Sequence, residues 1–446
     1  MARALSQQSD FVWLDSRQDE RATNAFSVLA WNATRKVAFA ASDAERFMDF
    51  LKSFSITKQH SDCDFCFQGG WIGYVTYEAL QYFHPQISLQ HDTNELRAAF
   101  AYYESFIHID HQKQNTFFVS LKDSAAAQHD LRVLQELLQN PKNPGAYKMA
   151  AAPQTLVSPE RYAADFAKIQ NALHCGTFYE LNYTLKYTAE FFGDAFALYL
   201  RLRATTPAPM MAFLDFSAFS SQLKILSASP ELFFKIANTI ITTKPIKGTI
   251  QRGHDPVSDA ALKNKLCACE KSQAELLMVT DMLRNDVGRF CETGSIRVAP
   301  LAAVESFSHY HHLVSGISGT LLPHISLADV FQNMFPGGSI TGAPKVKVMQ
   351  EIARLEDRAR GVYTGAIGFI SNHGFVEFNI PIRTMTIVNN ILEFSVGGGI
   401  VADSSCADEF DECRVKAAGI LAALNSPSLG FQPPSPRFRG EGRGEG

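Results

Sequence analysis

Short apolar runs separated by turn residues recur along much of the chain, and they predict neighbouring pairs of strands. Residues 364–370 and 375–380 flank a Ser-Asn-His-Gly turn, and residues 383–388 and 391–396 flank Asn389-Asn390. Two runs joined by so short a connection are typical of a β-hairpin. Consecutive hairpins favour an α+β fold, with large and mainly antiparallel sheets and helices on the outside.

The chain before residue 154 mixes strand-like and helical runs. Residues 100–110 are rich in aromatic and β-branched side chains and predict one strand, with residues 115–121 as its hairpin partner. Residues 140–153 are rich in proline, glycine and alanine, which predicts a linker. We therefore expect an amino-terminal subdomain over residues 1–145 and a catalytic domain over residues 154–425.

A helix is expected directly after this linker. Ser158 is a suitable N-cap, Pro159 suits the first helical position, and Gly176 ends the pattern. The apolar face of the helix comprises Tyr162, Phe166, Ile169 and Leu173. At the other end of the chain, residues 426–446 bury little apolar surface and are expected to be disordered.

Composition excludes several classes of protein. Of 446 residues, 46% are hydrophobic, which allows a sizeable core, and the net charge of −4 with no basic stripe gives no indication of nucleic-acid binding. No apolar run suits a membrane span or a signal peptide. The 8 cysteines are scattered, which favours a reduced, cytoplasmic setting. Cys63 and Cys66 lack the second pair that a zinc site needs.

One lysine follows a predicted strand. Residues 238–243 are mostly β-branched, and Pro245-Ile246-Lys247-Gly248-Thr249 then predicts a tight turn that holds Lys247 on a stiff frame. If that frame faced a pocket, desolvation would lower the pKa of Lys247 and make its amine a nucleophile. Taken alone, the pentapeptide favours an ordinary, solvated turn lysine.

Two predicted helices carry carboxylates of interest. Ser272 to Glu275 has the pattern of a capping box, so on pattern alone Glu275 caps its own helix. Residues 276–283 are largely apolar, however, and would place Glu275 beside buried surface, where a divalent cation would offset the cost of its charge.

The second acidic helix follows Ser404-Ser405. Glu409 and Glu412 share one of its faces, and hard oxygen ligands suit Mg²⁺. The helix macrodipole and a pair with Lys416 are also sufficient structural reasons for acids at these positions.

Three segments are candidates for binding an anion. Gly397, Gly398 and Gly399 follow a predicted strand and could offer backbone N–H groups, and residues 336–344 lead into a helix N-terminus. Arg383 could bind a carboxylate with two hydrogen bonds. Each signal alone is weak, because a glycine run is more often a bend and a lone arginine more often a surface charge.

Together these motifs resemble the chorismate-utilising enzymes, a family that includes the anthranilate, aminodeoxychorismate, isochorismate and salicylate synthases. Residues 67–74 also resemble the amino-terminal glycine motif of the members that transfer an amino group. The resemblance implies a β-sandwich core and a chorismate-binding domain over residues 154–425. The matching segments keep the family's order and are residues 227–231, 245–249, 281–289, 312–315, 337–344, 363–365, 381–384 and 397–404.

The resemblance also implies roles for individual residues. Glu275 and Glu412 are expected to bind Mg²⁺, with Glu409 as a less certain neighbour. Glu231 is expected to help the 4-hydroxyl depart, and His312 is expected near the ring, although without the resemblance a buried structural histidine would be preferred. The expected substrate contacts are Tyr363, Arg383, Gly397, Gly398, Gly399, Ser339 and Thr341.

Lys247 separates the subfamilies. Aminodeoxychorismate synthases typically carry lysine there, which is thought to attack carbon 2 of chorismate and expel the 4-hydroxyl before ammonia adds at carbon 4. Anthranilate synthases usually carry alanine. Residues 179–183 contain no lysine, which argues against the water-adding isochorismate chemistry, and Glu180 stands where glutamine is often found.

The resemblance therefore implies component I of an aminodeoxychorismate synthase, which makes 4-amino-4-deoxychorismate on the route to p-aminobenzoate and folate. The chain has no Gly-x-Cys-x-Gly setting for a glutaminase nucleophile, so ammonia is expected from a separate glutaminase subunit. The alternatives are anthranilate synthase component I and a non-catalytic chorismate-binding paralogue.

Overall fold

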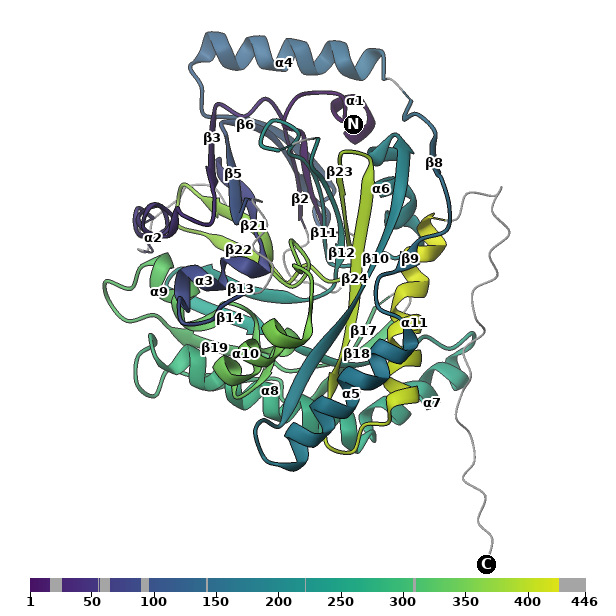
Figure 1. The fold of residues 1–446 in the computed structure, drawn as a ribbon. Helices are drawn as coiled ribbons and strands as arrows, with labels where there is room; N and C mark the ends of the chain where they lie inside the picture. Colours follow the sequence, from purple (N-terminus) through teal and green to yellow (C-terminus); the bar gives the residue numbers. More distant parts are fainter. Residues whose placement is uncertain are drawn as a thin grey trace, which may run out of the picture.

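The computed structural model describes residues 1–16, 26–54, 56, 65–89, 96–141, 143–220, 222–307 and 310–424. Cys63 and residues 426–446, on which two of the predictions above rest, lie outside the described residues. Two large sheets and one small sheet form the framework (Figure 1). Every strand pairing among the described residues is antiparallel.

The first large sheet has the order β20-β10-β24-β23-β12-β11-β1-β2-β6-β7, and β8 and β9 also pair with β10. Its strands are β1 (Val12–Asp15), β2 (Phe26–Ala30), β6 (Ser105–Asp110), β7 (Asn115–Ser120), β8 (Tyr147–Met149), β9 (Gln154–Thr155), β10 (Glu180–Gly193), β11 (Met210–Asp215), β12 (Lys224–Ser229), β20 (Gly342–Ala343), β23 (Thr384–Val388) and β24 (Ile391–Ile400).

The second large sheet has the order β16-β19-β14-β13-β22-β21-β4-β5-β3, and the small sheet has the order β15-β18-β17. The strands of the second sheet are β3 (Arg35–Phe39), β4 (Gly70–Val75), β5 (Ala98–Tyr103), β13 (Leu232–Ala237), β14 (Ile240–Lys244), β16 (Arg297–Val298), β19 (Ile317–Thr320), β21 (Ala366–Ser371) and β22 (Val376–Asn379). Those of the small sheet are β15 (Ile246–Gln251), β17 (Ala303–Ser306) and β18 (Tyr310–Val314).

The helices lie around the outside of the sheets (Figure 1). They are α1 (Ala2–Leu5), α2 (Ala44–Lys52), α3 (Leu80–Phe83), α4 (Ser124–Gln139), α5 (Pro159–His174), α6 (Ala195–Thr205), α7 (Pro256–Cys267), α8 (Glu270–Gly288), α9 (Leu327–Met334), α10 (Lys345–Leu355) and α11 (Cys406–Leu424), with short 3₁₀ turns η1 (Tyr77–Ala79) and η2 (Gly338–Ile340). In the described ranges, no helix combines the length and apolar character that crossing a bilayer requires.

Apolar residues of the two large sheets meet in a shared core. Val28 and Ile225 come from the first sheet, Ile72 and Ile367 come from the second, and all four belong to one buried cluster. Burial of such a side chain contributes about 1.5–3 kcal/mol. Two antiparallel sheets that share a core, with helices outside, confirm the predicted α+β fold with a β-sandwich core.

Several predicted elements are confirmed. Residues 366–371 pair with residues 376–379, and β23 pairs with β24 across Asn389-Asn390, whose positive φ angles suit a tight hairpin turn. The helix after Ser158 runs from Pro159 to His174, and the Ser158 side chain accepts a hydrogen bond from the Arg161 N–H, as an N-cap does. The two hairpins lie in different sheets, which the sequence pattern did not indicate.

The prediction of one strand over residues 100–110 was wrong. The chain breaks at Glu104, so that β5 ends in the second sheet and β6 begins in the first. Both strands are mostly buried, so their apolar residues form one uninterrupted run in the sequence. A run of this kind does not reveal where a chain changes sheet, because β-branched and aromatic residues suit both positions. The expected hairpin of β6 with β7 is confirmed.

Both large sheets contain strands from before residue 145 and from after residue 154. The predicted linker also contributes to a sheet, because Tyr147 to Met149 pairs with β10. The division into 1–145 and 154–425 stays a prediction about the chain, and in space the two segments share sheets.

The glycines of residues 67–74 allow β4 to lie between two close neighbours. A Cβ on Gly73 would lie 2.1 Å from the Ala99 carbonyl oxygen and 2.5 Å from the Phe100 ring. We expect Gly73→Ala to lower the free energy of unfolding by about 1–3 kcal/mol, because overpacking forces the backbone to shift. Urea denaturation measures this change. Gly288→Ala, whose nearest neighbour would be Ile296 at 3.4 Å, is the matched control. Equal effects for the two variants would contradict this account.

Candidate active site

Lys247 lies where the chain passes from the second large sheet to the small sheet. β14 ends at Lys244 and β15 begins at Ile246, so the expected tight turn is instead a continuing strand, with a bulge between Lys247 and Thr249 against β18. Gly248 has a φ of +74°, and a Cβ there would lie 2.9 Å from Ser272. The bulge re-aims the side chains of the strand, and this backbone requires glycine.

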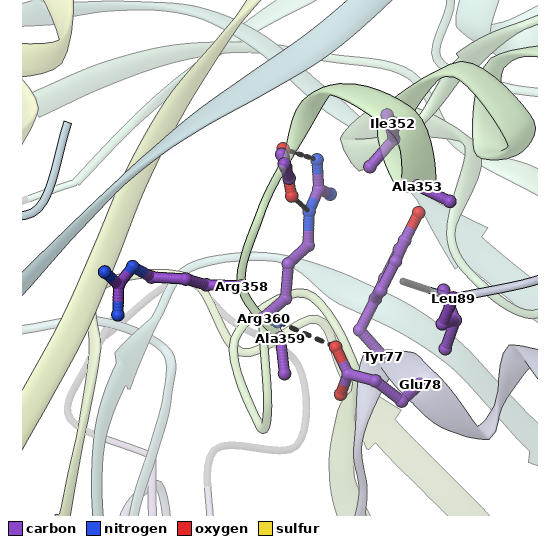
Figure 2. Close-up of a pocket in the computed structure, with 9 residues that line it drawn as sticks. Tyr77, Glu78, Leu89, Ile352, Ala353, Arg358, Ala359 and Arg360 are labelled. Atoms are coloured by element: carbon purple, nitrogen blue, oxygen red, sulfur yellow. Dashed lines mark hydrogen bonds and ion pairs between the residues drawn. The ribbon is translucent and has the colours of Figure 1, made fainter. Parts of the chain in front are cut away.

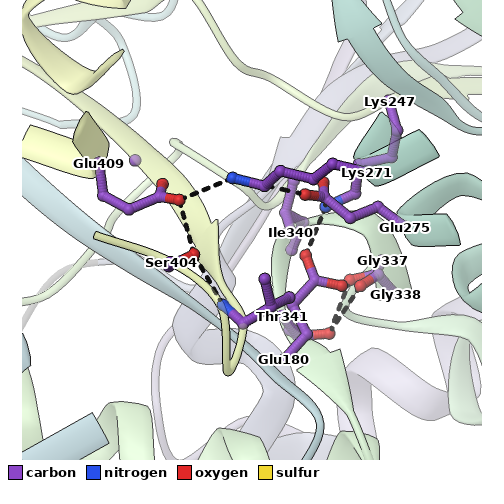
Figure 3. A network of polar contacts seen from close by, with 12 residues as sticks. Glu180, Lys247, Lys271, Glu275, Gly337, Gly338, Ile340, Thr341, Ser404 and Glu409 are labelled. Atoms are coloured by element: carbon purple, nitrogen blue, oxygen red, sulfur yellow. Dashed lines mark hydrogen bonds and ion pairs between the residues drawn. The ribbon is translucent and has the colours of Figure 1, made fainter. Parts of the chain in front are cut away.

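Two carboxylates surround the Lys247 ammonium. Its Nζ donates a hydrogen bond to Glu180 Oε1 at 2.5 Å and lies 3.7 Å from Glu275 Oε2 (Figure 3). Burial alone would lower the pKa of Lys247, but the charges of Glu180 and Glu275 outweigh burial and raise it. The expectation that desolvation lowers this pKa was therefore wrong, since it could not include carboxylates from distant elements.

Glu180 begins β10 and pairs with Lys247. It is 1% exposed, and its Oε2 has no hydrogen-bond partner among the residues that the structure describes. On the neighbouring strand β24, a Cβ on Gly399 would lie only 2.0 Å from Glu180 Oε1 and 3.2 Å from Lys247 Nζ. Glycine at position 399 therefore makes room for the ion pair between Glu180 and Lys247.

Glu275 lies within α8 rather than at its start. The helix begins at Glu270 with Cys269 as N-cap, and the Ser272 hydroxyl donates to Cys269 Sγ, so the predicted capping box was wrong. Since Glu275 does not cap the helix, its carboxylate is available to Lys247 and to Lys271, whose Nζ lies 3.9 Å away. Burial raises the pKa of Glu275, and Lys247 counteracts that effect.

The acids of α11 lie on the other side of Lys271. Lys271 Nζ donates to Glu409 Oε1 at 3.0 Å, and the Ser404 hydroxyl donates to the same oxygen at 2.7 Å (Figure 3). Glu412 is half exposed and pairs with Lys416 at 2.8 Å, as its spacing suggested, and this lysine lowers the pKa of Glu412. The predicted acidic helix is thus confirmed, and its acids face those of α8.

The carboxylates of α11 offer the type of oxygen ligand that a hard cation prefers. No three His, Cys, Asp or Glu side chains within the described ranges are close enough together to hold a metal ion as they stand. Gly398 leaves space beside the acids of α11, because a Cβ there would lie 3.1 Å from Glu409 Oε2 and 4.0 Å from Glu412 Oε1. Carboxylate oxygens such as these two of α11 are the ligands that Mg²⁺ prefers.

Glu231 lies in the turn between β12 and β13 and is 3% exposed. Within the described part of the chain, its Oε1 has no hydrogen-bond partner. Burial raises the pKa of Glu231 to about 7, against the opposing effects of Ser339 and Lys247. A carboxyl group with such a pKa is protonated for part of the time at neutral pH, which a general acid requires.

Arg383 is a partly buried cation that forms no ion pair within the described part of the chain. It precedes β23 with a φ of 52°, and its guanidinium lies 5.3 Å from the centre of the Tyr310 ring. Burial lowers its pKa. A partly buried guanidinium without a carboxylate partner has the chemistry to bind an anionic group.

His312 lies near this arginine, on β18. Its Nδ1 is 2.8 Å from the Thr249 hydroxyl, and burial together with Arg383 lowers its pKa to about 3. His312 is therefore neutral near pH 7, where it can donate or accept one hydrogen bond at Nε2 but cannot supply a positive charge.

The remaining predicted contacts lie in two backbone segments. Gly397, Gly398 and Gly399 do not follow a strand but lie within β24, opposite residues 182–184 of β10. Pairing with β23 stops at Phe394, so only one edge of the glycine run belongs to a ladder. The Gly397 carbonyl accepts a hydrogen bond from Lys416 at 2.8 Å.

The other segment contains Ser339 and Thr341. Both are buried, and the Thr341 hydroxyl donates to the Gly337 carbonyl at 3.0 Å, so that it shapes the loop (Figure 3). Tyr363 is buried before β21, and burial raises its pKa. Their contacts with a substrate stay a prediction.

A buried network that the sequence did not reveal supports this loop. Arg360 forms a two-pronged ion pair with Glu356 and donates to the carbonyls of Ile340 and Asn182 at 3.0 and 2.8 Å. Figure 2 shows Arg360 beside Tyr77, with its backbone N–H donating a hydrogen bond to Glu78. An acid and an arginine four residues apart are common on helix surfaces, so the spacing gave no sign of burial.

The sequence of this chain is similar to those of known proteins. The model of the chorismate binding enzyme family matches residues 9–422, and the chain belongs to this family. Aminodeoxychorismate synthase component 1 of Klebsiella aerogenes is 37% identical over 361 residues, which cover 81% of this chain and 78% of that protein. Anthranilate synthase component 1 of Saccharolobus solfataricus is 30% identical over 400 residues, 90% of each chain.

A solved structure agrees with this assignment. Anthranilate synthase component I from Streptococcus pneumoniae superposes with a TM-score of 0.77 at 29% identity, covering 91% of this chain and 94% of that one. The chain is thus a member of a family of chorismate-utilising enzymes. Its similarity to the first relative is the greater of the two, which favours the aminodeoxychorismate branch.

The space beside Gly399 can be tested directly. In Gly399→Ala the new methyl group would displace the Glu180 carboxylate from Lys247, so we expect the rate of chorismate consumption to fall by about tenfold or more. Gly419→Ala, whose Cβ would lie at an ordinary 3.5 Å from Thr206, should consume chorismate at the parent rate. Steady-state kinetics with circular dichroism of both variants measures this. A fully active Gly399→Ala enzyme would contradict the role given to this glycine.

Proposed function

We propose that this chain converts chorismate and ammonia to 4-amino-4-deoxychorismate, for p-aminobenzoate and folate synthesis. The observation that carries the choice is Lys247, a buried amine that lies between Glu180 and Glu275 in a site of the family that binds chorismate. The name of the Klebsiella relative supports the same product. Anthranilate synthase component I remains the alternative, supported by its lower but extensive similarity.

The charges of the site suit a dianionic substrate that binds together with one divalent cation. Glu231, with its raised pKa, adds little charge at neutral pH. The four ion-paired carboxylates therefore face an equal number of cations. The carboxylates are Glu180, Glu275, Glu409 and Glu412, and the cations are Lys247, Lys271, Lys416 and Arg383. A chorismate dianion would upset this balance, and one divalent cation would restore it.

Glu275 and Glu412, with Glu409 beside them, are the residues that would hold Mg²⁺ in this proposal. The bound ion would neutralise a substrate carboxylate and polarise the ring. Arg383 would bind the other carboxylate, and Tyr363 with the loop of Ser339 would exclude water from the ring.

The chain's own groups would then carry out the proton and bond changes. The Lys247 ammonium must lose a proton before it attacks, and Glu180, at 2.5 Å, is the acceptor in reach. Attack of Nζ on carbon 2 shifts the ring double bonds and breaks the bond from carbon 4 to its hydroxyl. Glu231 donates the proton that lets this group leave as water. Ammonia then adds at carbon 4, and the lysine leaves from carbon 2.

A separate glutaminase subunit is the proposed source of ammonia, in keeping with the words "component 1" in the name of the Klebsiella relative. The cytoplasm is the proposed compartment. The described cysteines are free, as a reducing setting requires.

The proposal is tested by product analysis. Purified chain with chorismate, Mg²⁺ and ammonium should form 4-amino-4-deoxychorismate, and chelation of the metal should stop the reaction. Lys247→Ala should lower that product by about 100-fold or more, because the covalent route is lost, while circular dichroism stays unchanged. Liquid chromatography with fluorescence detection separates the products. Fluorescent anthranilate from the parent enzyme would favour the alternative, and an unchanged Lys247→Ala enzyme would refute the nucleophile.

Glu231 should also give the reaction a pH dependence. Its carboxyl group must carry a proton to act, and its pKa is raised to about 7, so that kcat should fall as pH rises through 7. His312, with a pKa of about 3, stays neutral and should cause no further change in kcat between pH 5 and 8. Steady-state rates at saturating chorismate measure the profile. Glu231→Gln should remove the fall in kcat together with most of the activity, and a parent rate that rises across pH 7 would contradict the assignment.

A further inference from the structure

Lys271 holds together two acids that the proposed function assigns to Mg²⁺. Its ammonium lies 3.9 Å from Glu275 Oε1 on its own helix and 3.0 Å from Glu409 Oε1 on α11. Figure 3 shows the lysine side chain extended between these two carboxylates. A positive charge therefore already occupies the gap between the acids of α8 and α11.

Glu409 depends on this lysine. Its side chain is 3% exposed, and Lys271 is the only basic group within 4.0 Å of it among the described residues. A buried carboxylate without a counter-charge is costly, and the Ser404 hydroxyl alone does not neutralise it. The protein without a metal ion thus needs Lys271, or an equivalent cation, at this place.

The Lys271 ammonium can also move away from these two carboxylates. Its side chain is 51% exposed, whereas those of Glu409 and Glu275 are 3% and 16% exposed. A long, flexible ammonium at the surface can swing into water, where it is strongly hydrated, while the two carboxylates stay fixed by their helices. Lys271 is therefore the mobile partner of this cluster, and Glu275 and Glu409 are the fixed ones.

We propose that Lys271 is an internal counter-cation that stands in for the metal between Glu275 and Glu409 and is displaced when Mg²⁺ binds. The inference rests on the proposed Mg²⁺ site. In this mechanism Lys271 keeps the empty site assembled and lowers its affinity for the ion, because binding must first break the ammonium contacts. Chorismate brings negative charge and so favours the exchange, which couples metal binding to substrate binding.

The test measures Mg²⁺ binding without chorismate, by isothermal titration of the full chain at constant ionic strength. Lys271→Met keeps the length of the side chain and removes its charge, so its Kd for Mg²⁺ should be at least about tenfold lower than that of the parent. Lys271→Arg keeps the charge and should bind as weakly as the parent. Lys347→Met, which removes a lysine paired with Glu351 on α10, is the matched control and should not change the affinity.

Thermal unfolding gives a second readout. Without Mg²⁺, Lys271→Met should melt below the parent, because Glu409 loses its counter-charge and Glu275 keeps only Lys247, and saturating Mg²⁺ should restore most of the loss. If Lys271 only tied α8 to α11, the variant would melt lower in both buffers and bind Mg²⁺ no more tightly. That result would overturn the inference.

These outcomes separate the inference from the proposed function. An unchanged Kd in Lys271→Met, with Mg²⁺-dependent amination by the parent, refutes only the role of Lys271. Mg²⁺ binding to neither protein, with or without chorismate, refutes the metal site itself and the inference with it. Should Lys271→Met fail to fold, Lys271→Gln is the second variant, and the same tenfold criterion applies to it.

Discussion

A buried charge is costly unless an opposite charge lies beside it, and ion pairs of this kind hold together most of the elements around this site. Lys247 and Glu180 join the small sheet to the start of β10, and Lys271 and Glu409 join α8 to α11. Lys416 joins α11 to β24 through the Gly397 carbonyl. Removal of one partner from such a pair leaves the other charge uncompensated, which costs far more than the pair contributes. The ion pairs that set the geometry of the site therefore also stabilise the elements around it.

Glycines make this crowding of charges possible. Gly399 leaves space for Glu180, and Gly398 leaves space beside the acids of α11, so two successive residues of β24 serve two different groups. A strand interior that contains glycine loses side-chain packing and rigidity. The long pairing of β10 with β24 compensates for that loss, since it continues on both sides of the glycine run.

Glu180 is the feature in which this chain departs from the pattern expected of its family. A carboxylate in contact with Lys247 holds that amine as an ammonium in the substrate-free site and also offers a place for its proton. A glutamine could accept the hydrogen bond but could not take the proton. The second oxygen of Glu180, buried without a partner, leaves capacity for one further donor.

Local signals in the sequence predicted much of the fold. The hairpins at residues 366–379 and 384–400, and the helix from Pro159, follow from turn residues and apolar spacing, which act over a few residues. The failures are equally local in origin. Residues 100–110 form two strands in two sheets. An apolar run does not show which sheet each half joins, so the pattern predicted a single strand. The capping pattern at Ser272 lies inside α8, because the helix begins before it.

For the site, the sequence by itself determined which groups are present and, through their order and spacing, the family to which they belong. It determined that a lysine, an arginine and several glutamates are available for one site. Only the tertiary structure decided the protonation and the ion-pair partners of these groups. It placed Glu180 and Glu275 beside Lys247, which reversed the expected direction of that pKa shift, and within the described residues it gave Arg383 no carboxylate partner. Protonation and pairing depend on burial and on charges within a few ångströms, and those neighbours come from elements far apart in the chain.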